Sequence, residues 1–198
     1  MTADTQAQAQ AAHEVIETRD AEGRLLRRLS TVNGVPDGEL VEFDEDGNLR
    51  LSMSFRAGVL HGPFRIFQDG RPQAEMTYVD GLLDGEVRSF DPGGRVIAVS
   101  RFVAGRRNGP SETFSPDGRL IRVEPYRDGR IEGEVLEYWD NGALRQRTPW
   151  QGGLKQGETL VFDEAGKPKE RIVFEAGIAK GPPEPLGDAR RRWLPFKR

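Results

Sequence analysis

The side chains that most often carry out chemistry in proteins are scarce in this chain of 198 residues. It has two histidines, His13 and His61, and no cysteine. Because nucleophilic catalysis and zinc binding draw on cysteine and histidine, this composition argues against either kind of site. Aspartate and glutamate are abundant, but no pair is set apart by its spacing as an acid and a base. The sequence therefore predicts a protein that is not an enzyme and has no cofactor.

A calcium site is the one metal site that the acidic residues suggest. Residues 44–46 read Asp-Glu-Asp, and calcium is bound by carboxylate and carbonyl oxygens. The equivalent turns further along the chain carry Gln68, Ser115 or Ala165, so no ligand spacing recurs. We therefore expect no metal ion.

The remaining chemistry is that of binding. A glutamate recurs at one mark of the repeat described below, at Glu39, Glu86, Glu134 and Glu158. Phe64 and Trp139 lie outside that repeat's aromatic rows: alternation places Phe64 on the face opposite Phe67, and Trp139 replaces the polar residue that usually begins a turn. Aromatic side chains on a polar surface are candidate interface anchors. Two structural alternatives stay open, a solvated row of glutamates and aromatics that cover a neighbouring hairpin.

These residues belong to a repeat. The stretch GVPDGELVEFDEDGNLRLSMSFRAG begins at Gly34, and related stretches begin at Gly58, Gly81, Gly105, Gly129 and Gly153, with the first residues again at Gly177. The spacing is 24 residues five times and 23 once. A fixed period in this range is typical of repeat architectures, in which one small unit stacks on its copies.

Each copy is predicted to be a β-hairpin. Leu49, Leu51, Met53 and Phe55 alternate at the strand period of two. Turns such as FDEDG and FSPDG predict a type I turn followed by a left-handed glycine. The G-x-x-x-G connection is too short for a crossover helix, so neighbouring hairpins should also be antiparallel. We therefore expect an all-β fold, an elongated array of stacked antiparallel hairpins with about six to seven repeats of 24 residues.

Two rows of aromatic residues run through the copies, one at each strand position. The first row is Phe43, Phe67, Phe90, Phe114, Tyr138 and Phe162. The second row is Phe55, Tyr78, Phe102, Tyr126, Trp150 and Phe174.

The composition along the chain predicts a single elongated domain with four segments. Residues 1–13 are an Ala/Gln-rich leader without hydrophobic period, expected to be disordered. Residues 14–33 read as a degenerate capping repeat, residues 34–181 as the array, and residues 182–198 as a Pro-rich and basic tail in which the repeat frame is lost.

Charge is distributed unevenly. The net charge is -3, the last nine residues carry +5, and the preceding residues therefore carry -8. An acidic body argues against nucleic acid over the array and favours a basic protein partner. The tail is a candidate contact for a membrane surface or an acidic partner patch. Its candidate residues are Arg190, Arg191, Arg192, Trp193, Phe196, Lys197 and Arg198. The first residues have neither the basic start nor the apolar run of a secretory signal, so the cytoplasm is the expected location.

The frame G-x-x-x-G-E/P-x-x-x-F/Y-x-x-x-G-x7-F/Y-x-x-G resembles the MORN (membrane occupation and recognition nexus) repeats. It looks closest to their bacterial variant, found in YwqK-type antitoxins, over about Gly34 to Gly181. It departs from the eukaryotic pattern, which has a further glycine two residues after the second frame glycine. Other residues stand at that mark here: Leu40, Phe64, Val87, Ser111, Val135 and Thr159. The resemblance implies a curved hairpin array that acts by binding and, in the bacterial variant, neutralises a toxin.

Two functions from different classes are therefore expected. The first is a non-enzymatic protein-binding module, a cytoplasmic antitoxin or immunity protein that covers a basic toxin domain with the concave or edge surface of its array. The alternative is a peripheral membrane scaffold held by the basic tail, where each Lys or Arg near an anionic surface supplies about 1 kcal/mol. The sequence leaves the oligomeric state open.

Overall fold

The computed structural model describes residues 11–187, and over this range the protein is all-β. Every strand pairing in it is antiparallel, and the predicted fold class is confirmed. Within the described range there is no helix long and apolar enough to cross a membrane. The contacts divide the chain into two compact units, with the boundary between Asp84 and Gly85. The sequence, by contrast, predicts a single domain. Each unit is described separately.

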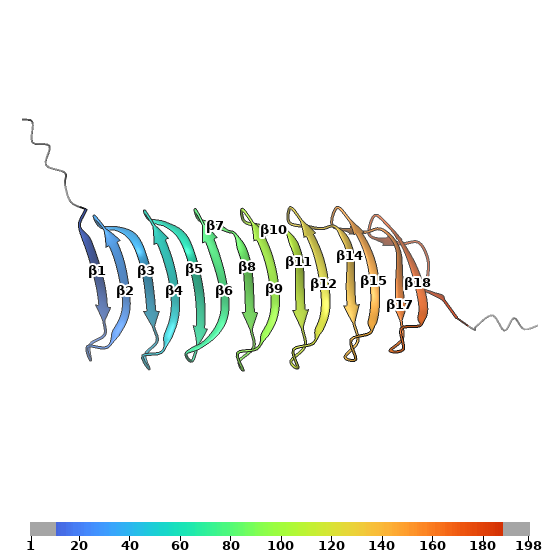
Figure 1. The fold of residues 1–198 in the computed structure, drawn as a ribbon, viewed down its shortest axis with the longest axis horizontal. Helices are drawn as coiled ribbons and strands as arrows, with labels where there is room; N and C mark the ends of the chain where they lie inside the picture. Colours follow the sequence, from blue (N-terminus) through green and yellow to red (C-terminus); the bar gives the residue numbers. More distant parts are fainter. Residues whose placement is uncertain (1–10, 188–198) are drawn as a thin grey trace, which may run out of the picture. The chain divides into compact units, whose positions relative to one another are not determined.

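The first unit contains three complete hairpins, which Figure 1 shows in blue to green. Its strands are β1 (His13–Arg19), β2 (Leu25–Val32), β3 (Val35–Phe43), β4 (Leu49–Arg56), β5 (Val59–Gln68), β6 (Arg71–Val79) and β7 (Leu82–Leu83). Each strand from β1 to β6 pairs with the next along the chain.

The second unit repeats the same hairpin with a short strand before each new copy (Figure 1). The strands of its first two hairpins are β8 (Gly85–Phe90), β9 (Val96–Val103), β10 (Arg106–Arg107), β11 (Gly109–Phe114), β12 (Leu120–Arg127) and β13 (Arg130–Ile131). The others are β14 (Gly133–Tyr138), β15 (Leu144–Gln151), β16 (Leu154–Lys155), β17 (Gly157–Phe162), β18 (Pro168–Glu175), β19 (Ile178–Ala179) and β20 (Glu184–Pro185).

The turn inside each hairpin has the predicted geometry. In the β3–β4 hairpin the N–H of Gly47 donates to the carbonyl of Asp44 at 3.0 Å, which closes a type I turn. Gly47 itself has a φ of 83°, the left-handed conformation that a glycine adopts without steric cost. The same bond recurs between Gly118 and Ser115. The prediction of this turn type is confirmed.

The junction between hairpins is a two-residue turn with both residues left-handed. Asn33 and Gly34 have φ values of 52° and 78°, as a type I′ turn requires. This turn matches the right-handed twist of the flanking strands, so neighbouring hairpins pair antiparallel as predicted. At three junctions, however, the first turn residue is an alanine: Ala57, Ala104 and Ala176.

A β-bulge in each hairpin separates the two aromatic rows. Glu42 pairs with Leu51 but Phe43 pairs with Leu49, so Arg50 is an extra residue on β4. Alternation along β3 then places Phe43 on the opposite side of the sheet from Glu42 and from the pair Gly38 and Phe55. We call the side with Phe43 and its equivalents the first-row face, and the side with Phe55 and its equivalents the second-row face.

Few side chains are fully buried, because the described strands of each unit form a single layer. On the second-row face Leu40, Val135, Thr148 and Thr159 are buried, and both aromatic rows are only half-buried. Val135 pairs with Thr148 across its hairpin, so burial is concentrated at the middle of each strand pair. Packing between adjacent hairpins therefore replaces a thick core.

The sheets extend past two of the expected segment boundaries. β1 begins at His13, inside the stretch expected as a leader, and pairs with β2 as a complete hairpin. At the other end Glu184 and Pro185 pair with β18, beyond Gly181. Strand pairing therefore continues over part of the stretch in which the repeat frame is lost.

Candidate functional site

The row of glutamates lies on the first-row face, and its members have polar partners. Glu86 accepts hydrogen bonds from Arg88 at 2.7 Å and Arg101 at 3.3 Å. The Arg88 guanidinium lowers the pKa of Glu86. In the first unit the hydroxyl of Ser52 donates to Glu39 at 3.0 Å.

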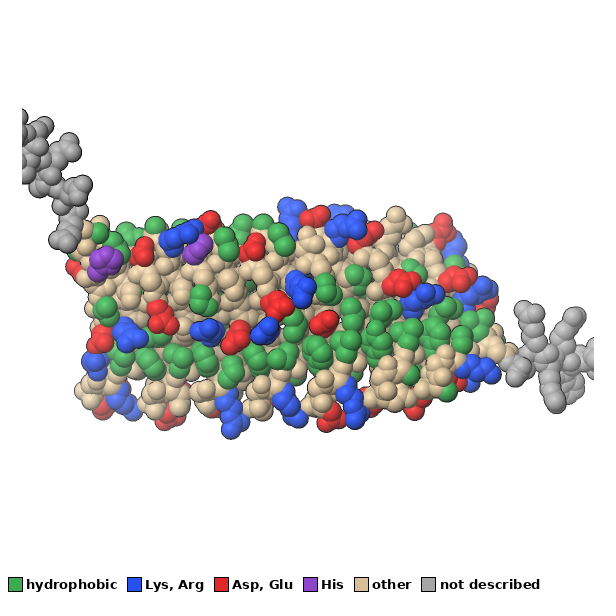
Figure 2. Space-filling model, viewed as in Figure 1, with side chains coloured by type: hydrophobic (Ala, Val, Ile, Leu, Met, Phe, Trp, Pro, Cys, Tyr) green, Lys and Arg blue, Asp and Glu red, His purple; other side chains and the backbone are tan. Residues whose placement is uncertain are grey.

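The other two glutamates of the row also pair with arginine. Glu134 lies 3.3 Å from Arg147, and Glu158 lies 3.0 Å from Arg171, which also contacts Glu184 at 2.5 Å. On Figure 2 positive and negative side chains alternate across the sheet. In the second unit each glutamate of the row is therefore one member of an ion pair with arginine. We call these pairs the ion-pair row, in which the negative charge of the glutamates is neutralised.

Within each unit the first-row face also carries apolar side chains, and Figure 2 shows hydrophobic side chains gathered beside charged ones. Five of the six first-row aromatics pair across their hairpins with a half-buried apolar residue, as Phe90 does with Val96 and Phe114 with Leu120, whereas Phe162 pairs with the exposed Pro168. Both members of each of the five pairs are half-buried. We call these pairs the hydrophobic band. Its members are Phe43 with Leu49, Phe67 with Pro72, Phe90 with Val96, Phe114 with Leu120, and Tyr138 with Leu144.

Phe64 is part of the packing of its own hairpin. It lies on the second-row face, opposite Phe67 as predicted, and pairs with Met76. Its ring centre is 5.7 Å from that of Tyr78, with the planes tilted by 53°. Because half of the side chain is covered in this way, Phe64 has a structural role in β5–β6.

Trp139 stands where other copies have a turn-forming aspartate. Asp163 Oδ1 accepts from the backbone N–H of Ala165 at 3.1 Å and of Lys167 at 2.8 Å. Asp91 makes the equivalent bonds to Gly93 and Arg95. The Lys167 N–H is the main cause of the lowered pKa of Asp163. A tryptophan has no acceptor, so the turn at Trp139 loses this aspartate cap.

Other contacts hold the Trp139 turn in place. Asn141 Oδ1 accepts from the N–H of Ala143 at 2.9 Å, and the indole N–H donates to the carbonyl of Phe162 at 3.1 Å. The guanidinium of Arg145 lies 4.9 Å from the indole ring centre, within cation–π range. The indole is thereby fixed, and a minor part of its surface remains exposed. This is a rigid aromatic surface of the kind that anchors interfaces.

One open pocket is lined by this indole, and a second is lined by other residues of the same turn and of the preceding turn. We treat them together as the Trp139 pocket. Their lining residues are Arg119, Leu120, Tyr138, Trp139, Asp140, Asn141, Gly142 and Glu164. Arg119 donates to the carbonyl of Asp140 at 3.0 Å, and Asn141 donates to that of Glu164 at 2.9 Å. An indole bordered by a guanidinium and carboxylates suits a mixed apolar and charged protein surface.

The sequence identified Trp139 but missed the side chains that surround it. Arg119, Asn141 and Glu164 come from three successive turns and meet because those turns lie side by side. The bonded pairs, Arg119 with Asp140 and Asn141 with Glu164, are 21 and 23 residues apart, close to the repeat period, which is the signal that could have grouped them. Phe64 belongs to the other unit, so the structure does not bring the two predicted aromatic anchors together within one unit.

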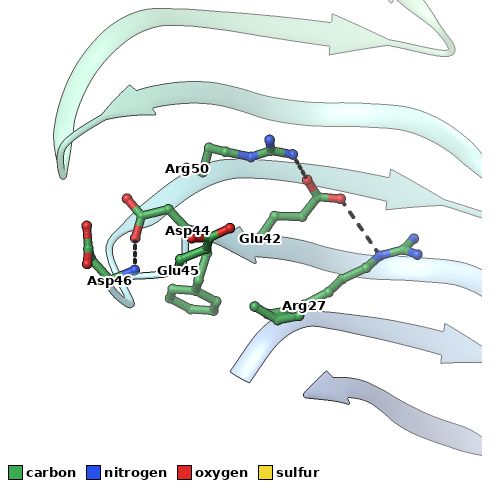
Figure 3. A pocket seen from close by; sticks show the side chains of 8 residues that line it. Arg27, Glu42, Asp44, Glu45, Asp46 and Arg50 are labelled. Carbon is green, nitrogen blue, oxygen red and sulfur yellow. Dashed lines mark hydrogen bonds and ion pairs between the residues drawn. The ribbon is translucent and has the colours of Figure 1, made fainter. Parts of the chain in front are cut away.

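A third open pocket, in the first unit, contains the acidic stretch considered for calcium (Figure 3). There Glu42 bridges Arg50 at 2.8 Å and Arg27 at 4.0 Å. Asp44 Oδ1 accepts from the N–H of Asp46 at 3.0 Å, so this oxygen is committed to its own turn. Among residues 11–187 no group of three or more His, Asp or Glu side chains is placed to hold a metal ion.

The basic tail residues named above, from Arg190 to Arg198, lie outside the described residues. The expected contact between that tail and a membrane or an acidic patch stays a prediction.

Comparison with known proteins gives one family match. The model described as "MORN repeat variant" matches residues 131–151, which contain the β14–β15 hairpin and Trp139. That hairpin is thus similar to a MORN repeat variant, and the other copies share its frame. No curated protein matches the chain.

Among solved structures, the chain is similar to a mutant of S. aureus TarM in complex with Fondaparinux, alpha-GlcNAc-glycerol and UDP. The identity is 10% and the TM-score 0.28, over 72% of this chain and 21% of the TarM chain. A score this low supports no conclusion about fold or function.

Proposed function

We propose that this protein is a non-catalytic, protein-binding repeat module that contacts its partner through the first-row face and the Trp139 pocket. The observation that carries the proposal is the replacement of a turn-forming aspartate by a tryptophan that lines an open pocket. The carboxylates of Asp91 and Asp163 accept hydrogen bonds from backbone N–H groups of their turns, and the indole of Trp139 has no acceptor for such bonds. A position that departs from a structural rule repeated elsewhere in the chain is a candidate for selection by function.

The hydrophobic band and the ion-pair row indicate the chemistry of the partner surface. The band offers half-buried aromatic side chains, and interfaces are enriched in such residues. The charge of -8 before the last nine residues favours a basic partner by long-range attraction. The finer proposal is a cytoplasmic antitoxin or immunity protein that blocks a basic toxin domain. Its support is the resemblance of the repeat frame to bacterial MORN-type antitoxins together with this charge.

The test is affinity purification of the full-length protein from its host at moderate salt, followed by mass spectrometry. We expect one stoichiometric partner with a basic surface. The variant Trp139→Asp should lose it, because the substitution removes the indole while restoring the aspartate of the other turns. Phe64→Leu, a change on the second-row face, should retain the partner and serves as the matched control.

The antitoxin proposal requires a second readout. Expression of the captured partner alone should slow growth, and co-expression of this protein should restore it, whereas co-expression of Trp139→Asp should not. A captured partner without toxicity would refute the antitoxin role and leave the binding module. An empty column together with tail-dependent flotation on anionic liposomes would replace both with the membrane scaffold.

A further inference from the structure

The first strand of the first unit has an open edge. Of the strands that the structure describes, β1 pairs with β2 alone. All seven β1 residues are exposed, with Val15 at 61% and Ile16 at 48%. An open edge with β-branched residues can pair with another strand.

The pairing with β2 shows which backbone groups point outward. The N–H of Ala12 donates to the Asn33 side chain at 3.0 Å, and the carbonyl of Ala12 accepts from the Asn33 N–H at 2.8 Å. Both groups of Ala12 therefore face β2. Because the direction alternates along a strand, the N–H and C=O groups of His13, Val15 and Glu17 face away from β2.

The last strand of the second unit has a different edge. The N–H of Leu186 points inward to the carbonyl of Lys169, at 2.6 Å. Alternation then places the backbones of Pro185 and Pro183 on the outer side, where proline has no N–H to donate. Prolines at such positions prevent strand addition. β1 contains no proline, so a contact between identical β1 strands is favoured over one between the two different edges.

We propose that β1 pairs antiparallel with β1 of a second copy of this chain, giving a two-fold dimer. In a two-fold contact each residue pairs with one whose side chain lies on the same side of the sheet. Because side chains alternate along a strand, the two residues of a pair are both odd-numbered or both even-numbered, and their numbers sum to an even number. Centring the contact on Val15 pairs Val15 with its copy, His13 with Glu17, and Glu14 with Ile16. The outward N–H and C=O groups of both Val15 residues then exchange hydrogen bonds.

Two of the neighbouring registers place like charges opposite one another, because centring on Glu14 or on Glu17 brings two identical carboxylates face to face. Centring on Ile16 sets His13 against Arg19, which offers the imidazole no carboxylate. Like charges directly opposite destabilise a strand pair, and opposite charges support it. The register centred on Val15 places His13 opposite Glu17, where the imidazole can donate to a carboxylate that also accepts from Arg19 of its own strand at 2.7 Å. This contact uses the edge of β1 and is separate from the surface proposed for the protein partner.

Sedimentation velocity of the full-length protein over low to high micromolar concentration tests the proposal. We expect a reversible monomer–dimer equilibrium. Val15→Pro removes an outward N–H without touching the bonds to β2, and should raise the dissociation constant about tenfold or more through two lost hydrogen bonds. Val15→Thr keeps the N–H and the β-branched shape, and should dimerise as the wild type does. Circular dichroism checks that both variants are folded.

A charge exchange tests the register itself. His13→Glu should weaken the dimer by facing Glu17 with a second carboxylate, and the double variant His13→Glu with Glu17→His should restore it. A wild-type protein that stays monomeric over the whole range would overturn the proposal, as would folded Val15→Pro that dimerises normally. A double variant as weak as His13→Glu would overturn the register.

Discussion

At the scale of single residues, three alanines occupy a backbone conformation that other residues adopt at lower cost. Ala57, Ala104 and Ala176 have φ values of 47° to 48° as the first residues of two-residue turns. The Cβ atom of an L-residue crowds its own backbone there, at a cost of about 1–2 kcal/mol. Asn33 occupies the same place in the first turn, and asparagine tolerates this conformation better.

We predict that Ala57→Asn stabilises the protein by about 0.5–1 kcal/mol, because the folded backbone is unchanged and its strain is relieved. In the wild type the backbone N–H of Ala57 donates to the Asp37 carboxylate at 2.9 Å. The variant keeps this hydrogen bond, because its donor is a backbone group. Thermal or urea unfolding measures the change. The opposite substitution, Asn33→Ala, should destabilise, because it introduces the strain and also removes the acceptor of the Ala12 N–H. An Ala57→Asn variant no more stable than the wild type would argue against strain at these turns.

The turn aspartates predict the dependence of stability on pH. The hydrogen bond from the backbone N–H of Arg95 to the Asp91 carboxylate is the main cause of the lowered pKa of Asp91. The hydrogen bond from the backbone N–H of Lys167 lowers the pKa of Asp163 in the same way. A carboxyl whose pKa is lower in the folded state stabilises the fold above its unfolded pKa. That contribution is lost as pH falls through the folded value. Unfolding temperature should therefore fall steeply below the ordinary aspartate pKa of about 3.9.

Asp163→Asn isolates this effect. The amide oxygen can still accept the two turn N–H bonds, but it does not titrate in this range. The variant should be less stable than the wild type at neutral pH, and the difference should shrink as the solution is acidified. Parallel stability curves for the two proteins between neutral and acid pH would show that Asp163 does not contribute to acid unfolding.

At the scale of the hairpin, two glycines of the same copy have different physical reasons to be glycine. Gly47 has a φ of 83° and open space where a Cβ would stand. Gly38 has a φ of 102°, and a Cβ there would lie 3.0 Å from the Cβ of Ser30 on the adjacent strand. Gly47 is therefore required by the backbone conformation of its turn. At Gly38 the backbone conformation also favours glycine, and the close approach of the neighbouring hairpin leaves no room for a Cβ atom.

We predict that Gly38→Ala destabilises more than Gly47→Ala. The turn variant should lose about 1 kcal/mol from backbone strain alone, and Gly38→Ala about 2 kcal/mol or more, because Ser30 must also move. Chemical unfolding of both variants supplies the comparison. If the two losses were equal, the contact with Ser30 would have no energetic weight.

The elements were predictable to the extent that they rest on local chemistry. Alternation from Leu49 to Phe55 and the glycine turns fix the hairpin, and the short connection fixes the antiparallel neighbour. The bulge at Arg50 was not predictable, since it depends on how two strands come into register. It decides that Phe43 and Phe55 lie on opposite faces, which spacing alone left open.

The candidate site was predicted in part for the same reason. Trp139 stood out because it breaks a local rule of the turn. The partners of Glu134 and Glu158 were not visible, since Arg147 and Arg171 are 13 residues away in sequence and meet them only through strand pairing. A local pattern identifies a residue out of place; long-range pairing determines what surrounds it.

At the scale of the whole molecule, the single layer of hairpins within each unit makes each copy depend on its neighbours. The few buried residues, such as Leu40 and Val135, lie within hairpins, and their cover comes from the side chains beside them. In such arrays stability is approximately a sum of repeat and nearest-neighbour terms. A complete copy should therefore be removable, because its two neighbours carry the same frame.

We predict that deletion of residues 105–128, one complete copy in the second unit, gives a folded protein. The deletion joins Ala104 to Gly129, which recreates the two-residue turn and brings β9 next to β13 and β14. Strand content should fall in proportion, and stability should fall because one neighbour interface is lost. Deletion of residues 109–120 removes half a copy, reverses the strand direction that follows, and should prevent cooperative folding. Circular dichroism with thermal unfolding distinguishes the two, and a half-copy deletion as well folded as the complete one would contradict the dependence on register.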